Sequence, residues 1–393
     1  MANIVAVTKG TYGDVIPFIA LGTALKQRGH RVTLVSHCHY KALAEGAGLE
    51  FDCWDTSQEY YTFVNDTHLL EDFRGIERFS HRHIFPTVKA EMMVIEKHCA
   101  SGDTILISKH MGALAASFVA ERRRVPIISV FVAAAQMMGY SVLIEIYRSV
   151  LSRAINKVRQ NVDLPAIEDW NEWAMSPTCF AGCWPPSFAT VPDVFYEKFV
   201  PTGFLKNDDA ERGELPSDLL EGLKSPSILI TGGTARSRLA PRFYRIAAEA
   251  CAEVGTHGIL VCPHESVVPG DLPASILRFK YLPFATLMPR VRAVIHHGGT
   301  SVLVRAISAG VPQLMLPFGA DRPDTARRVE RLGIGRCIIA SRWSASSIAT
   351  VLSELMSSVD VRNACLNAQG LLLECKRYLD IACVRFESLA VQH

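Results

Sequence analysis

The stretch AVIHHGGTSVLVRAISAGVP, residues 293–312, decides which fold the second half of the chain adopts. An apolar run with β-branched residues ends in two histidines and two glycines, and a segment with helical apolar spacing follows at once. A buried strand joined to a helix by a short turn is the repeating unit of a parallel α/β sheet. The free N–H groups and partial positive charge at the start of such a helix favour an anion. The stretch therefore predicts an α/β domain with an anionic ligand at the end of this strand.

Strand-like and helix-like segments alternate in both halves of the chain, which predicts a parallel sheet with helices on both faces in each half. The expected strands are 3–8, 31–36, 104–108, 126–131, 227–231, 258–262, 293–297 and 313–317. A polar stretch between the halves, 206–226, contains prolines and an Asp-Asp pair and is interpreted as a linker with a short helix. We expect an N-terminal domain over 1–205 and a C-terminal domain over 227–393. The last helix of the chain is a candidate for packing back on the N-terminal domain.

Length and composition exclude several classes of protein. A chain of 393 residues fits two domains, at roughly 100–200 residues each. A net charge of +2 gives no reason to expect a nucleic-acid partner. The 11 cysteines are scattered and no leader segment precedes the first strand, so we expect a reduced, cytoplasmic protein. The longest apolar window, 125–140, is interrupted by polar residues and shorter than the ~20 residues of a membrane span.

A glycine turn after the first strand, in TKGTYGDVIPF, carries the first candidate for chemistry. Gly10 and Gly13 allow a sharp turn, and Asp14 lies at or just before the start of the following helix. Asp14 has two interpretations, which the residues alone leave open. It can cap the helix, which contributes ~1 kcal/mol, or it can take a proton from an incoming hydroxyl.

Two further glycine turns are candidates for phosphate binding. TGGTARS, residues 231–237, offers Gly233 and Thr234, but lacks the lysine of a P-loop. After His296 the chain reads Gly298, Gly299, Thr300 and Ser301 before the helix starts. Adjacent histidines on a strand point to opposite faces, so a metal site there is not expected. Asp321 follows the next strand, either as a helix cap or as an acceptor of hydrogen bonds from vicinal hydroxyls.

Taken together, these segments resemble the nucleotide-sugar-dependent, inverting GT-B glycosyltransferases of family 1. This group includes antibiotic and macrolide, sterol and rhamnolipid-type enzymes. The resemblance rests on three segments: GTYGDVIPFIALGTALKQRGHRVTLVSH (10–37), VPTGF (200–204) and LPFATLMPRVRAVIHHGGTSVLVRAISAGVPQLMLPFGADRPDTARRVERLGIG (282–335). It implies the GT-B fold, in which two Rossmann-like, doubly wound α/β domains face each other across a cleft.

The resemblance also implies roles for individual residues. Asp14 matches the general base, His296 the histidine that contacts the donor diphosphate, and Asp321 the acid that binds the sugar hydroxyls. The backbone of Leu282 matches the group that pairs with the nucleobase. The full set implied for the nucleotide sugar is Gly13, Gly233, Thr234, Leu282, His296, Gly298, Gly299, Thr300, Ser301, Asp321 and Arg322.

Two residues depart from the family pattern. Val302 stands where bacterial members have a hydroxyl, and Arg322 follows Asp321 where members have glutamine. Arginine adds a fixed cation and no acceptor, which leaves the identity of the donor sugar open.

Two irregular segments, 53–85 and 136–186, follow strands of the first half and are rich in aromatic residues. Insertions after the strands of an open α/β sheet lie at its carboxyl end, where ligands bind. They are the expected acceptor-binding loops, although packing of the loops by their own aromatic residues is an equal alternative. The candidate acceptor-binding side chains are Trp54, Tyr60, Phe63, Phe131, Met137 and Tyr147.

The resemblance therefore implies a hexosyltransferase that moves a sugar from a UDP- or dTDP-linked donor to a hydroxyl of a small, apolar natural product or lipid. No metal and no cofactor besides the nucleotide sugar is expected, and the chain is expected to be a monomer or homodimer. The main alternative is an inactive relative that activates a partner enzyme. An epimerase shares the fold, but its acid and base groups cannot be placed in this sequence.

Overall fold

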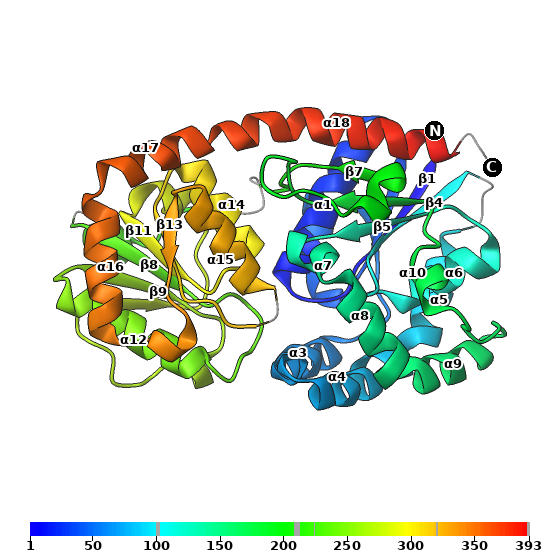
Figure 1. Cartoon of the computed structure of the whole chain (residues 1–393), viewed down its shortest axis with the longest axis horizontal. Helices are drawn as coiled ribbons and strands as arrows, with labels where there is room; N and C mark the ends of the chain where they lie inside the picture. The colour runs from blue at the N-terminus through cyan, green and yellow to red at the C-terminus, as the bar shows by residue number, and fades with distance from the viewer. Residues whose placement is uncertain (100–102, 208–212, 224, 320, 391–393) are drawn as a thin grey trace. The chain divides into compact units, whose positions relative to one another are not determined.

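The computed structural model describes residues 1–99, 103–207, 213–223, 225–319 and 321–390 (Figure 1). Its internal contacts divide the chain into two compact units. The N-terminal unit comprises Met1–Asn207 and Glu374–His393, and the C-terminal unit comprises Asp208–Leu373. Each unit contains its own parallel sheet.

The sheet of the N-terminal unit has the order β3-β2-β1-β4-β5-β6-β7, and all neighbouring strands are parallel. Its strands are β1 (Asn3–Val7), β2 (Arg31–Val35), β3 (Glu50–Asp52), β4 (Thr104–Lys109), β5 (Ile127–Phe131), β6 (Cys179–Gly182) and β7 (Phe199–Pro201). The order runs outward from β1 in both directions, as in a doubly wound Rossmann-like fold. The chain therefore reverses its direction of travel beside β1, where such folds bind ligands.

Alternate residues of the central strands face two different cores. Ile4 and Ala6 of β1 belong to one cluster, and Val5 and Val7 belong to the other. Because both faces are apolar, the strand is a continuous apolar run, as expected for a buried parallel strand. The helices of this unit are α1 (Tyr12–Gln27), α2 (Lys41–Gly46), α3 (Ser57–Asn65), α4 (Phe73–Phe79), α5 (Val88–Lys97), α6 (Leu114–Arg123), α7 (Ala134–Met138), α8 (Tyr140–Ile146), α9 (Ser152–Gln160) and α10 (Trp170–Ala174).

The sheet of the C-terminal unit has the order β10-β9-β8-β11-β12-β13 and is also parallel throughout. Its strands are β8 (Ser227–Thr231), β9 (His257–Val261), β10 (Ile276–Phe279), β11 (Ala293–His296), β12 (Gln313–Met315) and β13 (Gly335–Cys337). Its helices are α11 (Ser217–Gly222), α12 (Ala240–Glu253), α13 (Phe284–Leu287), α14 (Thr300–Ala309), α15 (Arg322–Arg331), α16 (Ala345–Ser357) and α17 (Val359–Ala368). The reversal of strand order lies between β8 and β11, the two strands that precede the predicted phosphate turns.

The expected fold class is confirmed in both units, and each of the eight expected strands is present. The sequence analysis did not find β3, β6, β7, β10 and β13, which have three or four residues each. Four of these five lie at the edges of the sheets, where one side of the strand is not paired. Short edge strands carry too few residues for a clear apolar pattern.

The last helix, α18 (Gly370–Ala390), contributes to the core of the N-terminal unit. Its buried residues there are Ala382, Cys383, Phe386 and Leu389. Glu387 adds an ion pair with Arg28, with Nε and Oε1 2.5 Å apart, and its Oε1 lies 2.9 Å from Nε2 of His30. At the other end of this segment, the N–H of Phe204 donates to Sγ of Cys375 at 3.1 Å.

Candidate functional site

Three turns of the C-terminal unit meet around His297, directly after β8, β11 and β12. A Cβ atom on Gly233 would lie 2.6 Å from Cε1 of this imidazole, and a Cβ on Gly299 would lie 2.8 Å from the same atom. Gly233 also has a φ of +77°, which side chains disfavour. Both glycines are therefore required for the ring to occupy its position.

His296 is fully buried, and both of its ring nitrogens have partners within the protein. The N–H of Gly298 donates to Nδ1 at 3.3 Å, so the ring proton lies on Nε2, which is 3.0 Å from Oε1 of Gln313. Burial lowers the pKa of His296 to about 4, against the opposing effect of the Gln313 hydrogen bond. This corrects the expected role of His296, because neither nitrogen is left for a diphosphate.

His297, the neighbour of His296, is enclosed by these turns. It is buried, and its Nδ1 has no hydrogen-bond partner among the described residues. Its ring lies 5.5 Å from the ring of Phe318. Burial lowers the pKa of His297 well below its usual value, and the charge of Arg322 acts in the same direction. The ring is therefore a neutral hydrogen-bonding group at neutral pH.

The helix α14 begins beside this histidine without a side-chain cap on its first turn in the described structure. Its N-cap is Gly299, and Gly298 before it has a φ of +99°. Thr300 and Ser301 are half-buried in this first turn. Val302, which departs from the family pattern, is buried in the core of the unit, so its side chain fills an interior position. An uncapped helix start with free N–H groups is suited to a phosphate.

Asp321 and Arg322 stand at the start of α15. Asp321 occupies the N-cap position but makes no side-chain capping bond in the described structure, so the capping interpretation of this carboxylate is not realised. Nη1 of Arg322 donates to the carbonyl of Phe318, and its Cζ lies 5.4 Å from the centre of that ring. A Cβ on Gly298 would lie 3.0 Å from Cβ of Arg322, so the two turns touch.

Thr234 and Leu282 complete the residues predicted for the nucleotide sugar in the C-terminal unit. The carbonyl of Thr234 is 2.8 Å from Nε2 of His264, and its side chain is half-buried. The side chain of Leu282 belongs to the core of the unit. Only the backbone of Leu282 is thus suited to the role that the sequence predicted for it.

In the N-terminal unit, Asp14 is the third residue of α1 and closes a capping box with Thr11. The N–H of Thr11 donates to its Oδ2 at 2.8 Å, and Nζ of Lys109 donates to its Oδ1 at 2.6 Å. A Cβ on Gly10 would lie 2.2 Å from Oδ2, so the carboxylate folds back over a glycine that cannot be replaced. Gly13 lies in the first turn of α1, with open space where a Cβ would be. The capping interpretation of Asp14 is therefore realised, alongside an ion pair that the sequence did not predict.

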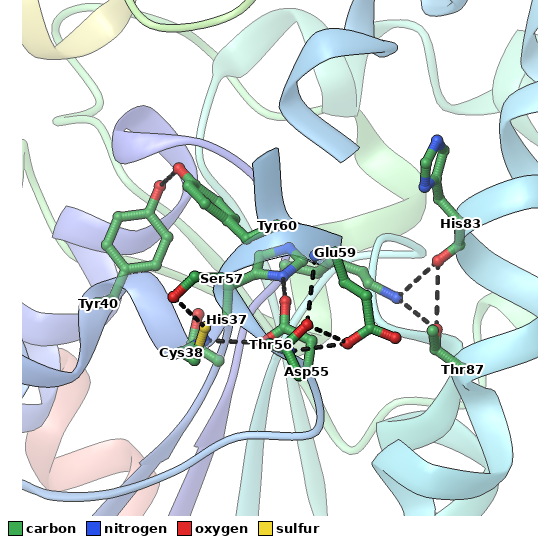
Figure 2. A network of polar contacts seen from close by, with 12 residues as sticks. His37, Cys38, Tyr40, Asp55, Thr56, Ser57, Glu59, Tyr60, His83 and Thr87 are labelled. Carbon is green, nitrogen blue, oxygen red and sulfur yellow. Dashed lines mark hydrogen bonds and ion pairs between the residues drawn. The ribbon is translucent and has the colours of Figure 1, made fainter. Parts of the chain in front are cut away.

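Three of the six residues expected to bind the acceptor surround the buried ring of His37. The ring of His37 lies 5.1 Å from that of Trp54, 5.1 Å from that of Tyr60 and 4.7 Å from that of Phe63. Figure 2 shows Asp55 pointing at this histidine, with Oδ2 2.6 Å from Nδ1. Burial lowers the pKa of His37, and Asp55 opposes that shift. Of the three aromatic side chains, Trp54 is the most exposed.

The other three candidates are Phe131, Met137 and Tyr147. Phe131 stacks on His110 at 4.1 Å and is fully buried, as is Met137. This corrects the expectation that Phe131 and Met137 bind the acceptor, because both side chains are enclosed by the protein core. The hydroxyl of Tyr147 donates to the carbonyl of Met111.

A cavity of about 250 Å³ lies along α6 in the same unit. Its lining includes His110, Met111, Ser117, Glu121 and Trp173, and none of the six residues predicted to bind the acceptor.

Across the described ranges, no three His, Cys, Asp or Glu side chains form a group that could hold a metal ion. In that same part of the chain, no helix combines the length and apolar character that a bilayer crossing requires.

Two family models match the chain, one within each unit. Residues 4–138 match the glycosyltransferase family 28 N-terminal domain, and residues 249–370 match the C-terminal domain of the erythromycin biosynthesis protein CIII-like family. The chain belongs to the GT-B glycosyltransferases. It is a glycosyltransferase of the macrolide and sterol family that transfers a sugar from a nucleotide sugar.

Relatives and solved structures resemble this glycosyltransferase over nearly its whole length. O-mycaminosyltylonolide 6-deoxyallosyltransferase of Streptomyces fradiae is 26% identical over 99% of this chain and 97% of its own. NDP-glycosyltransferase YjiC of Bacillus subtilis is 24% identical over 91% of this chain and 90% of its own. The structure of the spinosyn forosaminyltransferase SpnP has a TM-score of 0.75 at 20% identity, covering 99% of each chain. The structure of VinC in complex with dTDP has a TM-score of 0.70 at 17% identity, covering 98% of this chain and 99% of its own.

Sequence reasoning missed several polar groups of the glycosyltransferase. His297 could have been found from the alternation of side chains along a strand, because a fully buried His296 leaves its neighbour facing the other way. Lys109 is the last residue of β4 and His110 follows it, at the carboxyl end of the sheet, which is the signal that could have found them. The His37–Asp55 pair joins the end of β2 to the loop after β3, and no local pattern predicts that contact.

Proposed function

We propose that the protein is an inverting, metal-independent glycosyltransferase. It moves a hexose from a UDP- or dTDP-linked sugar to a hydroxyl of a small, apolar natural product or lipid. The observation that carries the proposal is the meeting of three turns at His297 beside the uncapped start of α14. Two of the compared proteins support these substrate classes. O-mycaminosyltylonolide 6-deoxyallosyltransferase supports the acceptor class, and the structure of VinC in complex with dTDP supports the nucleotide of the donor.

The C-terminal unit binds the nucleotide sugar in this proposal. The diphosphate contacts the N–H groups around Thr300 and Ser301, with Gly298 and Gly299 allowing close approach, and the ring of His297 packs against the Gly233 and Gly299 turns. Asp321 accepts hydrogen bonds from the sugar hydroxyls, and its freedom from a capping bond supports that role. The remaining donor contacts in this unit are those proposed for Gly233, Thr234, the backbone of Leu282, and Arg322. Gly13 is the donor contact proposed from the N-terminal unit.

Asp14 acts as the general base. It takes the proton of the acceptor hydroxyl as the oxygen attacks C1 from the face opposite the diphosphate. The bond between C1 and the diphosphate oxygen breaks, and its electron pair leaves with the diphosphate. A single displacement of this kind inverts the configuration at C1. Hydrogen-bond donors at the diphosphate stabilise the developing charge, and the loss of one such donor costs about 10²–10³ in rate.

Thermal unfolding with UDP-glucose, dTDP-glucose and glucose 1-phosphate tests the proposal. We expect one of the two nucleotide sugars to stabilise the protein, by ~2.7 kcal/mol at 100 times its Kd. Turnover with that donor is then measured with cholesterol or a macrolactone alcohol, with and without EDTA. We expect a product of inverted anomeric configuration by NMR and no effect of the chelator. Binding without turnover or donor hydrolysis would instead identify an inactive auxiliary protein.

A further inference from the structure

Lys109, the last residue of β4, makes the closest polar contact to the proposed base. Its Nζ lies 2.6 Å from Oδ1 of Asp14 and 3.5 Å from the carbonyl oxygen of Lys9. A Cβ on Gly112 would lie 3.0 Å from Cδ of Lys109, so the turn after β4 closes against the lysine stem. The ammonium group is thus held from the side of β4, while Asp14 is held from the side of α1.

The two oxygens of Asp14 are fixed from different directions. Thr11 holds Oδ2 through its backbone N–H, and Lys109 holds Oδ1 through a charge-assisted hydrogen bond. Two contacts on opposite oxygens fix the rotation of the carboxylate, which a single contact does not. The hydroxyl of Thr11 also donates to Oδ2, at 3.4 Å. An ionised carboxylate has about four lone-pair positions, so one remains for an incoming hydroxyl, on Oδ1.

The exposure of this pair distinguishes it from other lysine–acid pairs in the same unit. Lys9 and Glu91 are each 3% exposed and hold the turn after β1 to α5 within the interior. Lys97, which pairs with Asp52, is 69% exposed. Lys109 and Asp14 are 19% and 21% exposed, so the pair is shielded from bulk water and still reachable.

We propose that Lys109 is a positioning residue for the transfer reaction: it holds the carboxylate of Asp14 in the orientation that accepts the proton of the acceptor hydroxyl. This inference rests on the proposed function, in which Asp14 is the base. In the reaction the proton passes from the hydroxyl to Asp14, and Lys109 acts only through its hydrogen bond to Oδ1. Its loss should therefore slow the chemical step and leave donor binding unchanged.

The test compares K109M, K109R and D14N with the double variant D14N/K109M. Turnover is measured as release of UDP or dTDP from UDP-glucose or dTDP-glucose with cholesterol or a macrolactone alcohol. Displacement of a reacting group by 1 Å costs up to about 10²-fold in rate, so we expect K109M to lower kcat by about 10- to 100-fold with the donor KM unchanged. K109R should restore most of the rate. In the D14N background, K109M should have no further effect.

Lys97→Met is the matched control, because it removes a lysine from another Lys–Asp pair of the same unit, and it should leave turnover unchanged. An unchanged kcat in K109M overturns the inference, as does an equal loss in the D14N background. A rise in donor KM at constant kcat overturns it too. If D14N itself keeps full turnover, the assignment of the base fails instead. Should K109M not fold, the comparison of K109R with K109Q decides in the same way.

Discussion

The imidazole of His297 occupies space that exists only because Gly233 has no side chain. A Cβ on Gly233 would lie 2.6 Å from Cε1 of His297, closer than two carbon atoms can approach without a shift. The two residues come from turns after different strands, β11 and β8. The ring therefore links the turns on which the proposed diphosphate contacts depend.

Gly233→Ala should weaken donor binding by displacing this ring. The φ of +77° adds a backbone cost of roughly 1–2 kcal/mol for any other residue. We expect at least tenfold weaker binding of UDP-glucose or dTDP-glucose by calorimetry, which corresponds to about 1.4 kcal/mol. Gly46→Ala is the control, because a Cβ there meets open space in a helical residue. Equal donor affinity in Gly233→Ala and in the control would argue against the role of the His297 ring.

Replacing the two adjacent histidines by alanine should have different consequences. His297→Ala should lower kcat by up to about 10²-fold, since it removes the ring that holds the turns of the proposed diphosphate site in position. His296→Ala should mainly lower stability, by about 1–3 kcal/mol, because Oε1 of Gln313 loses its buried partner. Turnover and urea unfolding of both variants separate the two effects. A loss of turnover in a stable His296→Ala variant, together with wild-type turnover in His297→Ala, would instead place the phosphate contact at His296.

Asp14→Asn should abolish most turnover while donor affinity stays nearly intact. The asparagine oxygen can still accept the N–H of Thr11, so the capping contact of α1 is kept. The capacity to take a proton is lost, since an amide is not a base, and the ion pair with Lys109 becomes a neutral contact. General-base groups contribute about 10²–10⁴ to the rate, and a loss of that size in kcat is the expected result. Wild-type turnover in a folded Asp14→Asn protein would remove Asp14 from the mechanism.

How far the sequence predicted this molecule depends on the range of the interaction. The β1–turn–α1 and β11–turn–α14 units follow from local apolar periodicity and glycine positions, so both were predicted. The partners of Asp14 and His296 lie on neighbouring strands, at Lys109 and Gln313, and no local pattern encodes them. For the same reason Phe131 and Met137 were assigned to the acceptor although they fill the core. Apolar composition does not distinguish a core from a binding pocket.

Acid should destabilise the protein over a range in which its buried histidines titrate. Burial lowers the pKa of His296 to about 4 and that of His110 to about 3, and it also lowers the pKa of His297. In the unfolded chain these groups bind protons near pH 6.5. Between pH 6.5 and about 4 the unfolded state therefore binds more protons, and the free energy of unfolding falls as pH falls. Each such histidine contributes up to about 1.4 kcal/mol per pH unit.

Carboxylates with lowered pKa values act in the same direction but at lower pH. Glu387, whose pKa is lowered to about 2 by hydrogen bonds from Arg28 and His30, loses its contribution only below about pH 4.5. Urea midpoints measured at pH 7.5, 6.5, 5.5 and 5.0 thus isolate the histidine effect. His296→Gln should flatten the dependence over this pH range, because glutamine does not titrate. A variant that keeps the full wild-type slope would show that His296 is not held neutral in the folded protein.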